Sequence, residues 1–208
     1  MKREAVISLS AAVLSLAFLP AAAQASAHED ANSNSPVDNT TVQRMVPAQA
    51  VFTKKLDAKQ AQQGQQFQVA LNQKVKLKNG EELPSGTVLE GTIVSDEMHS
   101  NGNSKLVLRF TQAHLKDGKD IPIQAAITGV YSQGSLDAQY GSEWTPAETN
   151  IEQESAMDGF DLHSRIGATN SGTFESANKS DLKFNRGSTL SLAIAPAEGA
   201  NTTNTAGE

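Results

Sequence analysis

The sequence predicts an all-β fold, a small antiparallel β-barrel or sandwich of about six to eight strands. First, apolar and polar residues alternate through residues 47–130, for example at 67–71 and 106–110, which is the period of half-buried strands. Second, Asn79-Gly80 and Asp117-Gly118 separate these runs, and both residue types tolerate the positive φ of tight hairpin turns. No apolar repeat with the helical period of about 3.6 residues crosses this region.

The strands of this β-domain, residues 47–130, are expected to follow one another through polar connections. Leu83–Thr87 contains Pro, Ser and Gly and is typical of a turn, and Asp96–Ser104 is expected to form a longer polar loop. The expected strands lie at 67–71, 75–77, 88–95, 105–111 and 121–127.

A final strand is expected within residues 182–197. Phe184–Ile194 shares the frame apolar-x-x-Gly-Ser/Thr-x-Leu-x-x-x-Ile with Leu83–Ile93, so it resembles one turn–strand unit of the β-domain. We therefore expect this strand to return to the sheet. The segment 131–181 would then be an excursion outside the barrel.

The excursion, residues 131–181, is poor in apolar residues and rich in Ser, Asn, Gly and Glu. Thr145–Glu148 resembles a capping box with proline at the first helical position, which favours one short helix from Pro146 to about Met157. A loop of this length inside a compact domain is usually functional or disordered.

Residues 1–27 are predicted to be a secretory signal peptide. A positively charged start precedes an apolar run that ends at Leu19, and the small residues that follow predict cleavage after Ala25 or Ala27. The alternative is a membrane anchor, but the run of about 15 residues is shorter than the roughly 20 that a span requires. No second apolar stretch approaches that length, so we expect no transmembrane segment after cleavage. We expect an exported bacterial protein, either periplasmic or extracellular.

Composition narrows the classes of function. The chain has 208 residues and a formal charge of −6, from 17 Lys and Arg against 23 Asp and Glu, which argues against a nucleic-acid partner. It contains no cysteine, which excludes disulfides, thiol catalysis and cysteine-based metal sites. Residues 28–46 and 198–208 are polar and contain few large apolar side chains, so we expect both to be disordered.

The search for catalytic chemistry gives no enzyme signature. No Gly-x-Ser-x-Gly elbow, phosphate-binding glycine loop or metal-ligand spacing of histidines is present, so we predict no catalytic residue, no metal and no cofactor. A hydrolase with an unrecognised site is a remote alternative, with Ser132 and His163 as its best candidates.

Lysines provide the first candidate binding feature. Lys74, Lys76 and Lys78 are expected on one strand face, because Val75 and Leu77 take the other. Such a basic stripe could hold phosphate-rich polymers of the cell envelope. The alternative is that these lysines only protect a strand edge against aggregation.

Aromatic residues of the excursion provide the second candidate. Tyr131, Tyr140 and Trp144, together with Phe160, could form a stacking platform for sugars or an anchor for a peptide. The alternative is that these side chains pin the excursion onto the barrel.

The stretch Leu56–Gly129 resembles the β-barrel of TrbI-like conjugation proteins, which are components of type IV secretion channels. The resemblance rests on the order and spacing of Lys74–Gly80, Leu83–Gly91, Leu106–Phe110 and Leu115–Ile123. It implies a β-barrel fold and a channel subunit that assembles into rings. The chain departs from that family because a signal peptide replaces its membrane helix and Pro-rich spacer, and its long antenna helices are absent.

Two hypotheses of function follow. The first is a non-enzymatic exported β-domain with a binding or structural role in the envelope, whose partner is an envelope protein or polysaccharide. The second is a subunit of an envelope secretion or conjugation channel, for which self-association is expected.

Overall fold

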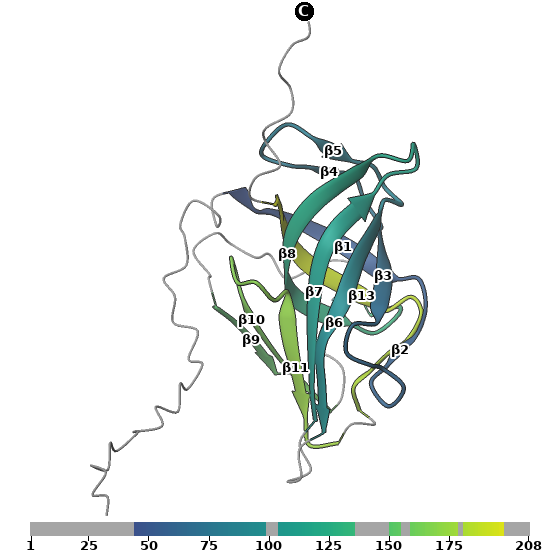
Figure 1. Cartoon of the computed structure of the whole chain (residues 1–208), viewed down its shortest axis with the longest axis vertical. Coiled ribbons are helices and arrows are strands. Elements are labelled where there is room, and N and C mark those ends of the chain that lie inside the picture. Colours follow the sequence, from purple (N-terminus) through teal and green to yellow (C-terminus); the bar gives the residue numbers. More distant parts are fainter. Residues whose placement is uncertain (1–43, 99–103, 136–149, 155–158, 179–180, 198–208) are drawn as a thin grey trace, which may run out of the picture. The chain divides into compact units, whose positions relative to one another are not determined.

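The computed structural model describes residues 44–98, 104–135, 150–154, 159–178 and 181–197. Six strands close into an antiparallel barrel in the order β6-β3-β1-β13-β8-β7, because β6 pairs with both β3 and β7 (Figure 1). The predicted all-β barrel is therefore confirmed. The barrel strands are β1 (Val46–Phe52), β3 (Gln66–Leu71), β6 (Val88–Met98), β7 (Ser104–His114), β8 (Asp120–Tyr131) and β13 (Thr189–Pro196).

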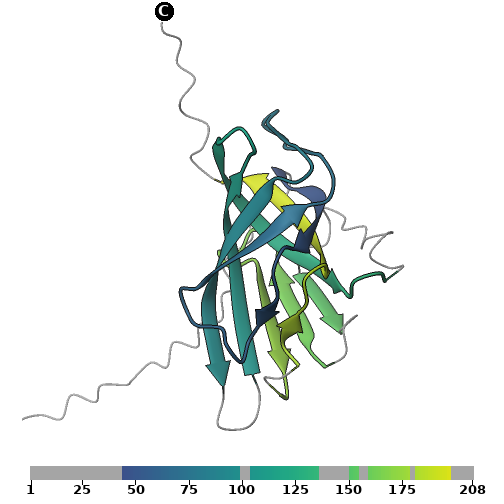
Figure 2. The same cartoon turned by 90° about the vertical axis from the view of Figure 1, so that its right-hand side faces the viewer.

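The remaining strands extend or flank this ring (Figures 1 and 2). Among the described residues, no helix is long and apolar enough to cross a membrane. Two small sheets pair β2 (Leu56–Asp57) with β12 (Lys183–Phe184), and β4 (Val75–Lys76) with β5 (Glu82–Leu83). From β7 the main sheet continues through β11 (Gly172–Ser176), β10 (Asp161–Arg165) and β9 (Asn150–Glu154).

The turns predicted from glycine are present. Gly80 and Gly118 have φ of 91° and 87°, which is the left-handed region that favours glycine. The loop predicted at 96–104 is shorter than expected, because β6 continues to Met98 and pairs its polar end with β7. Backbone pairing continues through the polar residues Asp96 and Glu97, so side-chain polarity alone predicts a loop that begins too early.

The last strand lies at the centre of the sheet rather than at its edge. β13 pairs with β1 on one side and with β8 on the other, which confirms its predicted return. Leu190 and Leu192 contribute to the main core, while Ala193 and Ala195 are buried on the opposite face beside Met45 and other apolar residues. Strand β1 begins at Val46, the last residue of the segment expected to be disordered.

The excursion is more ordered than the sequence predicted. Its strands β9, β10 and β11 lie outside the six-stranded ring, as expected, but they join the same sheet through β7. Residues 150–154 form strand β9, so the prediction of a helix is wrong over these residues. The remaining residues of the predicted helix, 146–149 and 155–157, lie outside the described residues. The helical signal was local, whereas β9 depends on pairing with β10.

Phenylalanine rings connect the barrel to this extension. Phe52 and Phe184 stack with centroids 5.3 Å apart, and Phe184 also contacts Phe160 and Phe174 of the excursion at 5.5 and 4.9 Å. On the barrel side, Phe67 lies 6.4 Å from Phe52. Offset and edge-to-face pairs at these distances are favourable. One continuous core therefore fills the barrel and supports the extension.

Strands β7 and β8 pair only near their shared turn and then diverge, forming a fork that Ser171 occupies. β7 and β8 pair only at residues 112–114 and 120–122. Beyond that point Ser171 donates its N–H to the Leu108 carbonyl at 2.8 Å and accepts the Ile127 N–H at 2.7 Å. Its Oγ accepts the Phe110 N–H at 2.9 Å, in a buried position. One residue thus satisfies backbone groups of both diverging strands.

We expect Ser171→Ala to lower the free energy of unfolding by about 1–3 kcal/mol, because it leaves the buried Phe110 N–H without an acceptor. Chemical denaturation monitored by circular dichroism measures the change. Ser132→Ala is the matched control, because Ser132 is exposed, and should shift stability by less than about 0.5 kcal/mol. Equal stability of both variants would contradict the role of the Ser171 hydroxyl.

Candidate functional site

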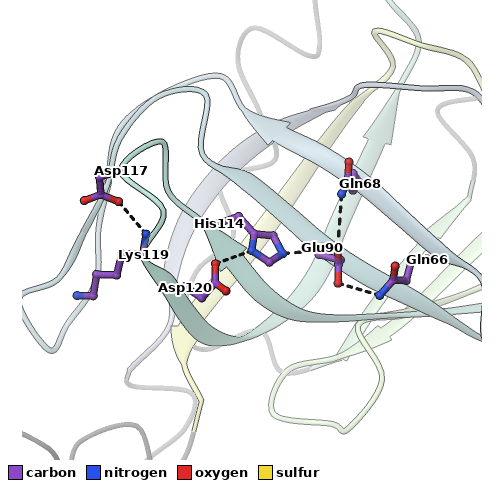
Figure 3. Close-up of polar contacts among 7 residues, drawn as sticks. All are labelled: Gln66, Gln68, Glu90, His114, Asp117, Lys119 and Asp120. Atoms are coloured by element: carbon purple, nitrogen blue, oxygen red, sulfur yellow. Dashed lines mark hydrogen bonds and ion pairs between the residues drawn. The ribbon is translucent and has the colours of Figure 1, made fainter.

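A ladder of polar side chains crosses the outer face of the barrel (Figure 3). Glu90 on β6 lies at its centre, where Oε1 accepts from Gln66 Nε2 at 3.0 Å and Oε2 from Gln68 Nε2 at 3.5 Å. His114 on β7 places Nε2 3.5 Å from Glu90 Oε2 and Nδ1 2.6 Å from Asp120 Oδ1. These five residues, the polar ladder, join strands β3, β6, β7 and β8.

The two carboxylates favour the protonated form of His114. The hydrogen bond that His114 donates to Asp120 is the largest influence and raises the pKa of His114 above its ordinary value of 6.5, while partial burial opposes the rise. The charges of Asp120 and Glu90 raise the pKa further. A protonated imidazole donates from both ring nitrogens, so it links three adjacent strands through two carboxylates.

This arrangement does not resemble a catalytic base. Both ring nitrogens of His114 face carboxylates, which leaves neither positioned to accept a proton from a nucleophile. Within the described residues, no hydrogen bond joins Ser132 to His163, the two candidates for a hydrolase. His163 is exposed on β10, opposite Thr173 and Glu152.

The three stripe lysines lie along the β4–β5 hairpin, but only Lys76 belongs to a strand, because Lys74 precedes β4 and Lys78 is in the turn that follows it. Lys74, Lys76 and Lys78 are exposed, while Val75 and Leu77 are 4 % and 2 % exposed and anchor the hairpin in the core. Lys74 pairs with Glu82 at 2.6 Å, and this contact lowers the pKa of the Glu82 carboxyl. Lys76 lies opposite the same glutamate across the β4–β5 pair.

The β7–β8 turn brings one lysine to this hairpin and a second lysine to the turn between β5 and β6. Lys119 Nζ lies 2.9 Å from Glu81 Oε1, and the Lys116 side chain covers Gly86, where an added Cβ would meet its Nζ at 3.1 Å. Asn79 and Lys119 lower the pKa of Glu81. We call the group of Lys74, Lys76, Lys78, Lys116 and Lys119 the lysine rim; in the described part of the chain, Lys78 and Lys116 form no ion pair.

The aromatic platform receives no support at the residue that can be placed. Tyr131 is 6 % exposed, and an added Cβ at Gly129 would lie 2.8 Å from its hydroxyl oxygen. Tyr131 therefore packs over a glycine on the same strand instead of presenting a ring to solvent. Tyr140 and Trp144 lie outside the described residues. Phe160 is buried in the core, as the packing alternative predicts.

No group of three or more His, Asp or Glu residues within the described ranges is arranged to hold a metal ion. No family model matches the chain, and no curated protein matches it at a significant level. The site must therefore be interpreted from its own geometry. The stripe lysines could be predicted from the sequence, but the polar ladder could not, because only the register between strands brings its members together.

We expect His114→Gln to cost more stability at about pH 5.5 than at about pH 8.5. The folded-state pKa of His114 is raised, so its stabilisation is complete below 6.5 and is lost as pH rises through the folded-state value. Urea denaturation of both proteins at the two pH values measures this difference. His163→Gln, which changes a histidine outside the ladder, is the control. If both variants lose stability with the same pH dependence, the polar ladder is not the cause of that dependence.

Proposed function

We propose that the protein is an exported, non-enzymatic barrel module that binds anionic polymers of the bacterial cell envelope. The observation that carries this proposal is the lysine rim, where two hairpins distant in sequence place five lysines beside three carboxylates, Glu81, Glu82 and Asp117. The chain as a whole has a formal charge of −6, so the rim is a local basic surface on an acidic protein.

Only some lysines of the rim are used in ion pairs within the protein, so others can bind a ligand. The Lys119–Glu81 pair joins the two hairpins, while the Lys74–Glu82 pair lies within the β4–β5 hairpin. Lys78 and Lys116 keep their charge available to a ligand. Protection of a strand edge by lysine remains the alternative for the β4–β5 pair. It gives no reason for Lys119, on the separate β7–β8 turn, to pair with Glu81.

We expect the variant Lys76→Gln/Lys78→Gln/Lys116→Gln to bind polyphosphate about tenfold or more weakly, since each ammonium near an anionic surface contributes about 1 kcal/mol. Fluorescence anisotropy with labelled polyphosphate, repeated across salt concentrations, measures the affinity. The matched control, Lys59→Gln/Lys183→Gln/Arg186→Gln, removes three exposed charges elsewhere. Equal losses in both variants would show attraction without a site, and no binding to the unaltered protein would refute the proposal.

Export is supported by the charged start, apolar run and small residues of 1–27. We expect the protein purified from an expressing bacterium to begin at residue 26 or 28, after cleavage at Ala25 or Ala27. Intact-mass spectrometry of the periplasmic and medium fractions measures this. A protein that retains residue 1 and stays with the cytoplasm would refute export.

A channel subunit is the second candidate. The six-stranded antiparallel barrel and the turns at Gly80 and Gly118 agree with the fold that the TrbI-like resemblance implies. That function requires ring assembly, which light scattering of the purified protein would reveal as a large symmetric oligomer. A monomer that still binds polyphosphate would favour the independent binding module.

A further inference from the structure

A small cleft lies between the end of β1 and the start of β3. Its volume is about 270 Å³, and apolar, amide and lysine side chains share its lining. The cleft lies at the start of β3, and the lysine rim follows the end of this strand. The strand, residues 66–71, is about 20 Å long. Its lining residues are Phe52, Lys54, Lys55, Leu56, Gln65, Gln66, Phe67 and Gln68.

The polar ladder fixes the orientation of two amides in this wall. Gln66 and Gln68 both donate from Nε2 to the carboxylate of Glu90, which can only accept (Figure 3). Each amide therefore turns its Oε1 away from Glu90. Because His114 holds the other side of Glu90, these two acceptors are positioned before any ligand arrives.

Two lysines, Lys54 and Lys55, also line the cleft. Lys55 pairs with Asp57 at 2.6 Å and is largely neutralised there. Lys54 is exposed and, within the described residues, forms no ion pair. The backbone between β1 and β2 is held against β3, because Thr53 Oγ1 donates to the Gln68 carbonyl at 3.1 Å. Lys54 therefore directly follows a residue that is held against β3, and it lines the same cleft as Gln66 and Gln68.

We propose that this cleft binds a single sugar acid, with Lys54 pairing with the carboxylate and the Oε1 atoms of Gln66 and Gln68 accepting hydrogen bonds from hydroxyls. The apolar lining residues Phe52, Leu56 and Phe67 suit the C–H face of a sugar ring. A bare anion such as phosphate gives fewer hydrogens to the two acceptors, and a neutral sugar lacks the charge that Lys54 recognises. This site is independent of the lysine rim and of the polymer proposal.

The test is a titration of the isotope-labelled protein with D-glucuronate, D-glucose and inorganic phosphate at constant ionic strength, followed by amide chemical shifts. We expect glucuronate to shift Lys54, Gln66 and Gln68 and to bind about fivefold or more tightly than glucose, a modest gain for one solvent-exposed ion pair. Equal affinity for glucuronate and glucose, tighter binding of phosphate, or shifts confined to the lysine rim would each overturn the proposal.

Matched variants assign the two recognition elements. Lys54→Gln should abolish the preference for glucuronate over glucose, whereas Lys59→Gln should preserve it. Gln68→Ala should weaken both sugars, whereas Gln60→Ala should weaken neither; Gln60 and Lys59 are exposed and lie outside the cleft. Thermal unfolding confirms that each variant is folded. A Lys54→Gln protein that keeps the preference refutes this site, even if the rim variant has lost polyphosphate binding.

Discussion

Three hydrogen bonds at Ser171 allow one sheet to be both a closed barrel and an open extension. A strand that leaves its neighbour exposes backbone N–H and C=O groups, and burying these groups without partners costs free energy. Ser171 satisfies such groups on β7 and β8 at the point where the strands separate. The barrel can therefore remain closed through β6 and β7 while the far end of β7 pairs with β11. Gly172, directly after it, has little room for a side chain, because a Cβ would lie 3.0 Å from Ser164 Oγ.

The fork also explains why the excursion belongs to the core. Once β11 pairs with β7, Phe174 is positioned to contact Phe184, and Phe160 completes the group of rings. The interior is filled by leucine, isoleucine and phenylalanine side chains, so the barrel is a packed core. Recognition is consequently expected on outer surfaces and at the ends of strands, which is where the lysine rim and the cleft beside Lys54 lie.

The sequence predicted the features that depend on local chemistry. Period-two alternation located the strands around residues 67–71 and 106–110, and Gly80 and Gly118 marked turns whose positive φ the structure confirms. The strands of the excursion were missed because a segment such as Asp161–Arg165 contains one apolar residue and gains its conformation from distant partners. The polar ladder was missed for a related reason: the sequence does not show which residues of β3 and β7 lie opposite Glu90 of β6.

Charge is arranged by strand pairing as much as by composition. The outer end of β3 leads to the hairpin that carries Lys74, Lys76 and Lys78, while its beginning presents Gln66 and Gln68 to Glu90. The carboxylates on this side of the barrel are engaged by His114 or by lysines, as Asp120 and Glu81 show. An acidic protein can thus present cations at two separate places, because its nearby acids are held within the framework. Electrostatic attraction of anions then depends on a few unpaired ammonium groups and not on net charge.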